Sequence, residues 1–220
     1  MDNEQPQTPL LLVLYREYLD HQDSAELTRE ISNRYTPGTL ERLAQSPDRQ
    51  IRRAAVLALG LVGDFDVNHT LGCALVDDDR TVRTLAQNGI RSVWCRAGNR
   101  RQQRQLRTIM RLVDARQYHD AIHRATELID KAPWFAEVWN QRAIARFNLG
   151  QYHESIRDCH QALELNPYHF AAAASMGQAY LELSNFVSAL ESFRRALRLS
   201  PDLEAVRFQV ARLTRMVEGM

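Results

Sequence analysis

The chain has 220 residues, 45% of them hydrophobic and 25% charged, with a formal net charge of +1. This balance is typical of a chain that buries a core, and no apolar run approaches the roughly 18 residues of a membrane-span candidate. Asp2 and Glu4 precede the first apolar run, where a secretory signal carries basic residues, so we expect a cytoplasmic protein. Because 27 of the 28 basic residues are arginine, we interpret the source as a GC-rich bacterium.

Cysteine is limited to three residues, Cys73, Cys95 and Cys159. They are too few and too scattered for a disulfide framework or a paired-cysteine zinc site. All three fall in segments that are expected to be helical, and unpaired cysteine behaves as a small hydrophobic residue. We therefore expect buried free thiols, and we predict no metal site and no cofactor.

The first predicted elements are two helices within residues 9–35. The pattern breaks around residues 21–24. Ser24 is a candidate N-cap for the second helix, because its hydroxyl can accept a hydrogen bond from a backbone amide. We interpret residues 1–35 as an N-terminal cap or a degenerate repeat.

A first internal repeat follows, in which segment 48–55 aligns with segment 79–86 and Leu59 falls on Ile90. Asp48 and Asp79 can each cap a helix that continues with an apolar stripe at helical spacing. Segments 40–45 and 69–76 complete two helix pairs. The pattern resembles the short form of the HEAT repeat, which implies stacked helix hairpins over residues 36–98 and a junction near Gly98.

A second internal repeat, with a longer period, covers the rest of the chain. Ala143, Ala145 and Ala162 align with small residues at positions 177, 179 and 196. Small residues allow paired helices to approach closely. Gly150 follows a helical stretch, where a left-handed C-terminal cap favours glycine. Prolines at positions 133, 167 and 201 close three copies, because proline lacks the amide hydrogen that a helix needs.

These copies resemble the tetratricopeptide repeat, whose unit of about 34 residues carries tryptophan, leucine-glycine, tyrosine, alanine and proline at fixed positions. Units 136–169 and 170–203 match well, whereas unit 102–135 matches mainly in its second helix. The resemblance implies an all-α fold, an α-solenoid with three units over residues 99–203 and a capping helix over residues 204–220. One face of that helix is apolar and the other polar; its apolar residues are Val206, Val210, Leu213 and Val217.

The resemblance also implies a binding surface, because the first helix of each tetratricopeptide unit lines a concave groove in which ligand peptides lie. An apolar strip flanked by amides suits an amphipathic helix or an extended peptide. We therefore predict a scaffold or adaptor that binds another protein. The alternative is that core packing or the terminal helix covers this strip. The predicted groove residues are Leu106, Met110, Val113, Asn140, Gln141, Ile144, Phe147, Ala174, Gln178 and Leu181.

One known use of this groove is not supported. Some tetratricopeptide proteins clamp the C-terminal carboxylates of chaperones with cationic and amide side chains at five groove positions. Carboxylate recognition of this kind needs charge-assisted donors. The corresponding residues, none of them cationic, are Leu106, Met110, Gln141, Ala171 and Ser175.

A basic block spans the predicted junction, since residues 80–113 hold nine arginines and no acid. Such a block creates a positive field that can attract an acidic protein or nucleic acid. In a third interpretation, the basic block is only a solvated face whose positive charge is neutralised by the acidic N-terminal segment, through contacts with Asp77, Asp78 or Asp79. Nucleic acid has the least support, because Trp94 is the only aromatic residue in the block. The arginines are Arg80, Arg83, Arg91, Arg96, Arg100, Arg101, Arg104, Arg107 and Arg111.

Catalytic patterns are nearly absent. His119 and His123 are four residues apart on one predicted helix, a spacing that can share a metal, but no third ligand is evident. We find no glycine-rich phosphate loop and no nucleophile with its base, so we predict that the chain is not an enzyme. A HEAT-type lyase subunit or another enzyme subunit is the remaining hypothesis, and it rests on the HEAT resemblance alone.

Overall fold

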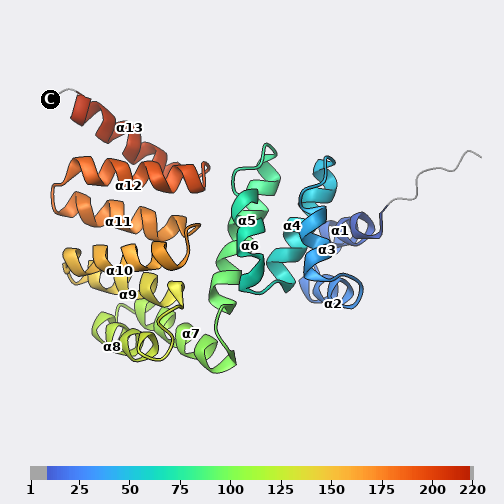
Figure 1. Ribbon diagram of the computed structural model, residues 1–220, viewed down its shortest axis with the longest axis horizontal. Helices are drawn as coiled ribbons and strands as arrows, with labels where there is room; N and C mark the ends of the chain where they lie inside the picture. The colour runs from blue at the N-terminus through green and yellow to red at the C-terminus, as the bar shows by residue number, and fades with distance from the viewer. Residues whose placement is uncertain (1–8, 219–220) are drawn as a thin grey trace, which may run out of the picture. The chain divides into compact units, whose positions relative to one another are not determined.

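The computed structural model describes residues 9–218; residues 1–8, which include Asp2 and Glu4, and residues 219–220 lie outside the described part. Within that part the chain is entirely helical, as predicted (Figure 1). No described helix is long and apolar enough to cross a membrane. The elements are α1 (Leu10–His21), α2 (Ser24–Arg34), α3 (Pro37–Leu43), α4 (Arg49–Val62), the 3-10 helix η1 (Phe65–Val67), α5 (Asn68–Ala74), α6 (Arg80–Arg96), α7 (Arg100–Asp114), α8 (Tyr118–Ile129), α9 (Ala136–Asn148), α10 (Tyr152–Leu165), α11 (Phe170–Glu182), α12 (Phe186–Leu199) and α13 (Glu204–Glu218).

The chain forms two compact units, the first ending at Val93 and the second beginning at Trp94. The last turn of α6 therefore belongs to the second unit. The division predicted from the sequence is finer, with segments 1–35, 36–98, 99–203 and 204–220, and it stays a prediction.

In the first unit, α1 and α2 form a hairpin that packs on α4. The N-cap of α2 is Asp23, whose carboxylate accepts the amide hydrogens of Ala25 and Glu26 at 3.0 and 2.9 Å. The prediction that Ser24 caps this helix was wrong by one position. A carboxylate at the N-terminus also interacts favourably with the helix dipole, which a hydroxyl cannot match.

The two aligned segments of the first unit begin alike. Asp48 accepts the amide hydrogen of Gln50 at 2.7 Å, and Asp79 accepts that of Val82 at 3.0 Å, so both predicted caps are confirmed. The helices that they start meet at a contact between glycines. A Cβ atom added to Gly60 would lie 2.7 Å from the Cα of Gly89, so neither position has room for a side chain.

Arginines tie the two segments of the first unit together. The guanidinium of Arg52 donates from Nε and Nη2 to both carboxylate oxygens of Asp77, each at 2.9 Å. Arg53 binds Asp79 in the same two-pronged way, with 2.9 Å between Nε and Oδ1. Bidentate pairs of this kind fix direction as well as distance, so these two pairs hold the start of α6 against α4.

In the second unit, each helix from α7 to α13 packs on the next, and Figure 1 shows α9 to α13 lying in sequence. The turn between paired helices recurs at the repeat period. Arg116, Gly150 and Ser184 all adopt the left-handed conformation, with φ of 59, 74 and 56°. The prediction for Gly150 is confirmed, and the same turn joins α7 to α8. The helix pair of segment 102–135 therefore shares this turn with the two pairs that follow.

Small residues permit the close helix packing of this unit. A Cβ atom added to Gly177 would lie 2.7 Å from the ring of Phe193. Ala143 and Ala145 are fully buried. The capping helix α13 buries Val206 and Leu213 as predicted, but its other face is not purely polar, because Phe208 there is 65% exposed.

Candidate functional site

The predicted groove residues of α7 differ in exposure. Leu106 is fully buried in the core beneath α7, where it packs with Ile109 and Leu128. Met110 and Val113 are half-buried, and Met110 packs against the edge of the same core. Of the three, Met110 and Val113 therefore offer side-chain surface to a ligand in this structure.

The predicted polar groove residues of α9 are bound to each other. Asn140 and Gln141 are buried, and both donate to Oε1 of Glu137, at 3.2 and 2.7 Å. Burial opposes the charge on Glu137, but the hydrogen bonds from His169, Gln141 and Asn140 outweigh burial and lower its pKa. One amide hydrogen from each of the two side chains thus stabilises an internal carboxylate, and burial leaves both side chains little surface for a ligand.

His169 completes this cluster. Its Nδ1 accepts the amide hydrogen of Ala172 at 3.1 Å, which caps α11. The ring proton must then lie on Nε2, which donates to Oε2 of Glu137 at 3.0 Å. The indole of Trp94 stacks on the imidazole, with 4.1 Å between ring centroids and 18° between planes, and it also contacts Phe170.

The cluster around Glu137, His169 and Trp94 was not predicted. The sequence placed Asn140 and Gln141 toward a ligand and assigned no role to His169. Trp94 and its stacking partner His169 are far apart in the sequence, so no helical periodicity connects them. One feature of the sequence could have pointed to the cluster. Glu137 lies in the first turn of α9 and His169 immediately precedes α11, so both stand at the starts of the first helices of successive units.

The remaining predicted groove residues form a partly exposed strip. Ile144 and Phe147 on α9 and Gln178 and Leu181 on α11 are half-buried, as is Ala174. The ring of Phe147 meets Tyr152 edge-on at 5.5 Å, which fixes its orientation. Apart from Ala174, this strip lies in the C-terminal halves of α9 and α11, away from the Glu137 cluster at their N-terminal ends.

A second buried network holds α9 against α10. The carboxylate of Asp158 receives both Nε and Nη2 of Arg142, at 2.9 and 2.8 Å, and Nη1 of Arg146 at 2.8 Å. Asp158 is almost fully buried. A buried carboxylate is stable only when several hydrogen bonds satisfy it, and here all three come from arginines of α9. The network therefore fixes α9, the helix that carries Ile144 and Phe147, against α10.

The basic block divides into bound and exposed members. Arg83 donates to the backbone carbonyls of Asp77 and Asp78, at 2.8 and 3.2 Å. The carboxylates of Asp77 and Asp79 are bound by Arg52 and Arg53, which lie outside the block. No carboxylate among the described residues pairs with the exposed arginines of α7, which are Arg100, Arg101, Arg104, Arg107 and Arg111.

Two of the three cysteines are shielded. Burial raises the pKa of the Cys95 and Cys159 thiols to about 12. Cys73 is exposed on α5 and Cys95 is half-buried, so the expectation of three buried thiols is confirmed for Cys159 and was wrong for Cys73. Within residues 9–218, no group of three or more histidine, cysteine or acidic side chains is arranged to hold a metal ion.

Two segments of the second unit match family models of the tetratricopeptide repeat, residues 136–169 and residues 171–203. These segments are tetratricopeptide repeats, as the second internal repeat of the sequence predicts. The assignment of residues 102–135 to the same family, and of residues 36–98 to HEAT-like repeats, stays a prediction.

Several known proteins share this sequence pattern. The chain is 26% identical to a TPR repeat-containing protein of Rhizobium etli over 132 residues. This match covers 60% of this chain and 65% of that protein. It is 32% identical over 82 residues to human DnaJ homolog subfamily C member 7, covering 37% of this chain and 17% of the relative. The chain thus spans less than two thirds of the length of either relative.

Two solved structures have a similar fold. The first tetratricopeptide domain of Spaghetti (RPAP3), bound to the HSP90 peptide SRMEEVD, has a TM-score of 0.53 and 21% identity, covering 55% of this chain and 96% of that one. The TPR2AB domain of yeast Sti1, in complex with pHSP90, has a TM-score of 0.50 and 14% identity, covering 93% of this chain and 97% of that one. At these identities the likeness shows the fold alone.

Proposed function

We propose that this chain, in which residues 136–169 and 171–203 are tetratricopeptide repeats, is a scaffold that binds a peptide or helix of another protein along α7, α9 and α11. The observation that carries the proposal is the partly exposed strip on α9 and α11. Its apolar members, Ile144, Phe147 and Leu181, can bury surface against a ligand, and the neighbouring amide of Gln178 can bond its backbone.

The buried cluster around Glu137, His169 and Trp94 limits the part of α9 and α11 that a ligand can contact. The side-chain amides of Asn140 and Gln141 donate to Glu137, and Trp94 covers the third partner of Glu137, His169. A ligand that bonded these groups would first have to break buried hydrogen bonds, at about 1–3 kcal/mol for each group left unpaired. We therefore place the binding surface in the C-terminal halves of the first helices, with Met110 and Val113 extending it onto α7.

The solved neighbours support a peptide ligand by fold, since the Spaghetti domain was determined with a bound peptide. We extend peptide binding, and not its HSP90 sequence, to this chain. A chaperone carboxylate clamp stays unsupported, because Leu106, Met110 and Gln141 stand where cationic donors are needed. The absence of catalytic activity, a cytoplasmic location and a bacterial source belong to the same proposal.

A second candidate function is an electrostatic adaptor. It is favoured by the five exposed arginines of α7, which have no carboxylate partner among the described residues. Such a surface attracts an acidic protein, with an affinity that falls as salt rises. Nucleic acid is the less supported ligand, because stacking aromatic residues are lacking there.

The two functions can be separated by affinity capture from a lysate of the source organism, with bound proteins identified by mass spectrometry. Wild type is compared with Phe147→Asp and with a combined Arg100→Glu, Arg101→Glu and Arg104→Glu variant. Phe147→Leu is the matched control for packing, and circular dichroism confirms that each variant keeps its helices.

Loss of a partner with Phe147→Asp, but not with Phe147→Leu, supports recognition by the strip. Loss with the triple arginine variant alone, together with release by salt, supports the electrostatic adaptor instead. A partner that every variant retains contradicts both proposed surfaces.

A further inference from the structure

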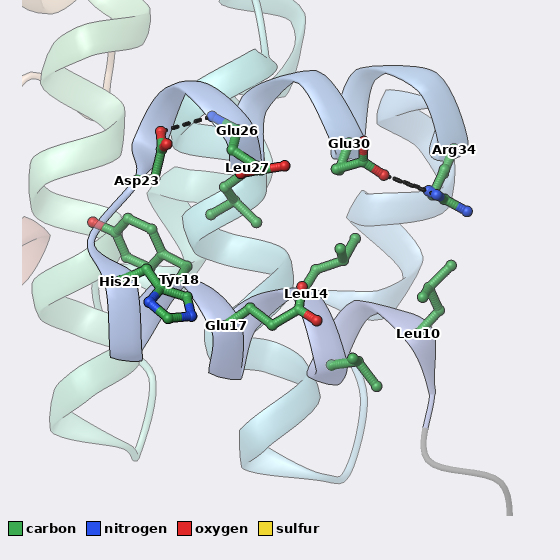
Figure 2. Close-up of a pocket in the computed structure, with 11 residues that line it drawn as sticks. Leu10, Leu14, Glu17, Tyr18, His21, Asp23, Glu26, Leu27, Glu30 and Arg34 are labelled. Carbon is green, nitrogen blue, oxygen red and sulfur yellow. Dashed lines mark hydrogen bonds and ion pairs between the residues drawn. The ribbon is translucent and has the colours of Figure 1, made fainter.

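The hairpin of α1 and α2 has an open groove of about 490 Å³ between its two helices (Figure 2). Figure 2 shows Leu14 and Leu27 projecting into this space, with Glu17 beside Leu14. Leu10 and Val13 also line it and are 43% and 37% exposed. Apolar side chains that stay this exposed in one connected groove are typical of an interaction site.

The groove is acidic as well as apolar. Glu30 pairs with Arg34 at 2.8 Å and Glu26 with Arg29 at 2.9 Å, so two of its acids are partly neutralised within α2. Glu17 has no ion-pair partner among the described residues. The acidic residues that line the groove are Glu17, Asp23, Glu26 and Glu30, against the single arginine Arg34.

The outer face of α13 has the opposite character. Phe208 is 65% exposed, although α13 buries Leu213 on its inner side. Arg212 and Arg215 follow Phe208 at intervals of four and three positions, a spacing that places all three on one face of a helix. Both arginines are exposed, and neither pairs with a carboxylate among the described residues.

We propose that the outer face of α13 of one copy docks in the α1–α2 groove of a second copy. Phe208 enters the apolar floor beside Leu14 and Leu27, and Arg212 and Arg215 approach Glu17 and the acidic rim. The lengths are compatible, because Phe208 to Arg215 span about 10 Å along α13, which fits within the roughly 18 Å of α1.

Charge selects this pairing over its alternatives. Two acidic grooves repel each other, and so do two faces that each carry Arg212 and Arg215. The contact therefore joins two different surfaces of identical chains. A contact of this kind leaves one free surface on each outer copy, so assembly continues until a ring closes or a filament forms.

The test is sedimentation velocity on the full chain over a range of protein concentrations, at low and at high salt. For wild type, the average mass of the sedimenting species is expected to rise with protein concentration and to fall with rising salt concentration. Phe208→Asp and Val13→Asp are each expected to weaken association roughly tenfold or more, because each places a charge at an apolar contact. Val187→Asp is the matched control, since Val187 is 57% exposed on α12 and lies outside both surfaces.

Mixing the two defective variants makes the decisive sample. Phe208→Asp retains an intact groove and Val13→Asp retains an intact α13, so together they are expected to form a one-to-one complex that grows no further. A wild-type protein that is monomeric at every concentration overturns the proposal. It is overturned in the same way if that monomer binds a different protein in the groove. Phe208→Asp that still associates with itself, or a mixture without a complex, also overturns it.

Discussion

His169 donates its Nε2 hydrogen to the carboxylate of Glu137 over 3.0 Å, and the imidazole has no exposed surface. The pair joins the start of α9 to the start of α11, two helices that belong to successive repeats. Because Trp94 stacks on the same imidazole and also contacts Phe170, the last turn of α6 packs against the start of α11.

Replacing His169 with alanine is expected to destabilise the second unit by about 3 kcal/mol, because it leaves the buried Glu137 carboxylate without its partner. It also removes the side-chain cap of α11. Urea unfolding followed by tryptophan fluorescence measures the change. His153→Ala, at an exposed position on α10, is the control and is expected to have almost no effect. Equal effects of the two substitutions would contradict a stabilising role for the pair.

Acid is expected to weaken the first unit through Asp79. The hydrogen bond from Arg53 is the main cause that holds the pKa of Asp79 below its ordinary value. A carboxylate with a lowered folded pKa stabilises the protein above its unfolded pKa of about 3.9, and this stability is lost as pH falls toward the folded pKa.

The Asp79→Asn variant is therefore expected to lose about 2 kcal/mol at neutral pH. Its difference in unfolding free energy from wild type should shrink as pH falls below about 4. Urea titrations followed by circular dichroism at several pH values test this. A difference that is constant with pH, or that grows in acid, would exclude the ionised pair as its source.

Alanine at Gly60 is expected to destabilise the first unit by about 1–3 kcal/mol, because its methyl group would meet the backbone of Gly89 and force α4 and α6 apart. Gly38→Ala is the matched control. No atom lies within 4 Å of a Cβ added there, and alanine favours the helix over glycine by about 1 kcal/mol. The midpoint of thermal unfolding should thus fall for Gly60→Ala and rise for Gly38→Ala. A midpoint that shifts in the same direction in both variants would refute the proposed close contact.

A thiol reagent is expected to modify Cys73 rapidly in the folded protein and to spare Cys95 and Cys159. Cys73 is exposed, whereas burial raises the pKa of the other two thiols to about 12 and removes the reactive thiolate. Mass spectrometry after brief labelling should find one adduct in native protein and three after denaturation. Rapid labelling of Cys159 in the native state would show that α10 packs less tightly than its buried thiol implies.

The repeat pattern predicted the helices of the second unit well, because small residues, prolines and turns recur at one period. Gly150 illustrates this, since its left-handed turn was predicted and recurs at Arg116 and Ser184 without glycine. The aspartate caps at Asp48 and Asp79 were predicted correctly. The error at Ser24 arose because two competent capping residues are adjacent and only the backbone geometry decides between them.

The candidate site was less predictable, because helical periodicity gives the face of a side chain but not its partner. Asn140 and Gln141 lie on the predicted face, yet Glu137 binds both. That outcome depends on His169, which caps α11 and lies 32 residues further along the chain. Similarly, the exposed Phe208 could not be distinguished by pattern from a residue covered by a neighbouring element.

The most direct test of peptide binding by the strip is site-specific photo-crosslinking, with a photoreactive amino acid placed at Gln178 in one sample and at Arg104 in another. Gln178 lies between Ala174 and Leu181 within the strip, whereas Arg104 is an exposed arginine of α7. We predict a covalent partner adduct from position 178, which Phe147→Asp abolishes. An adduct that forms only from position 104 would contradict the account and assign binding to the basic block.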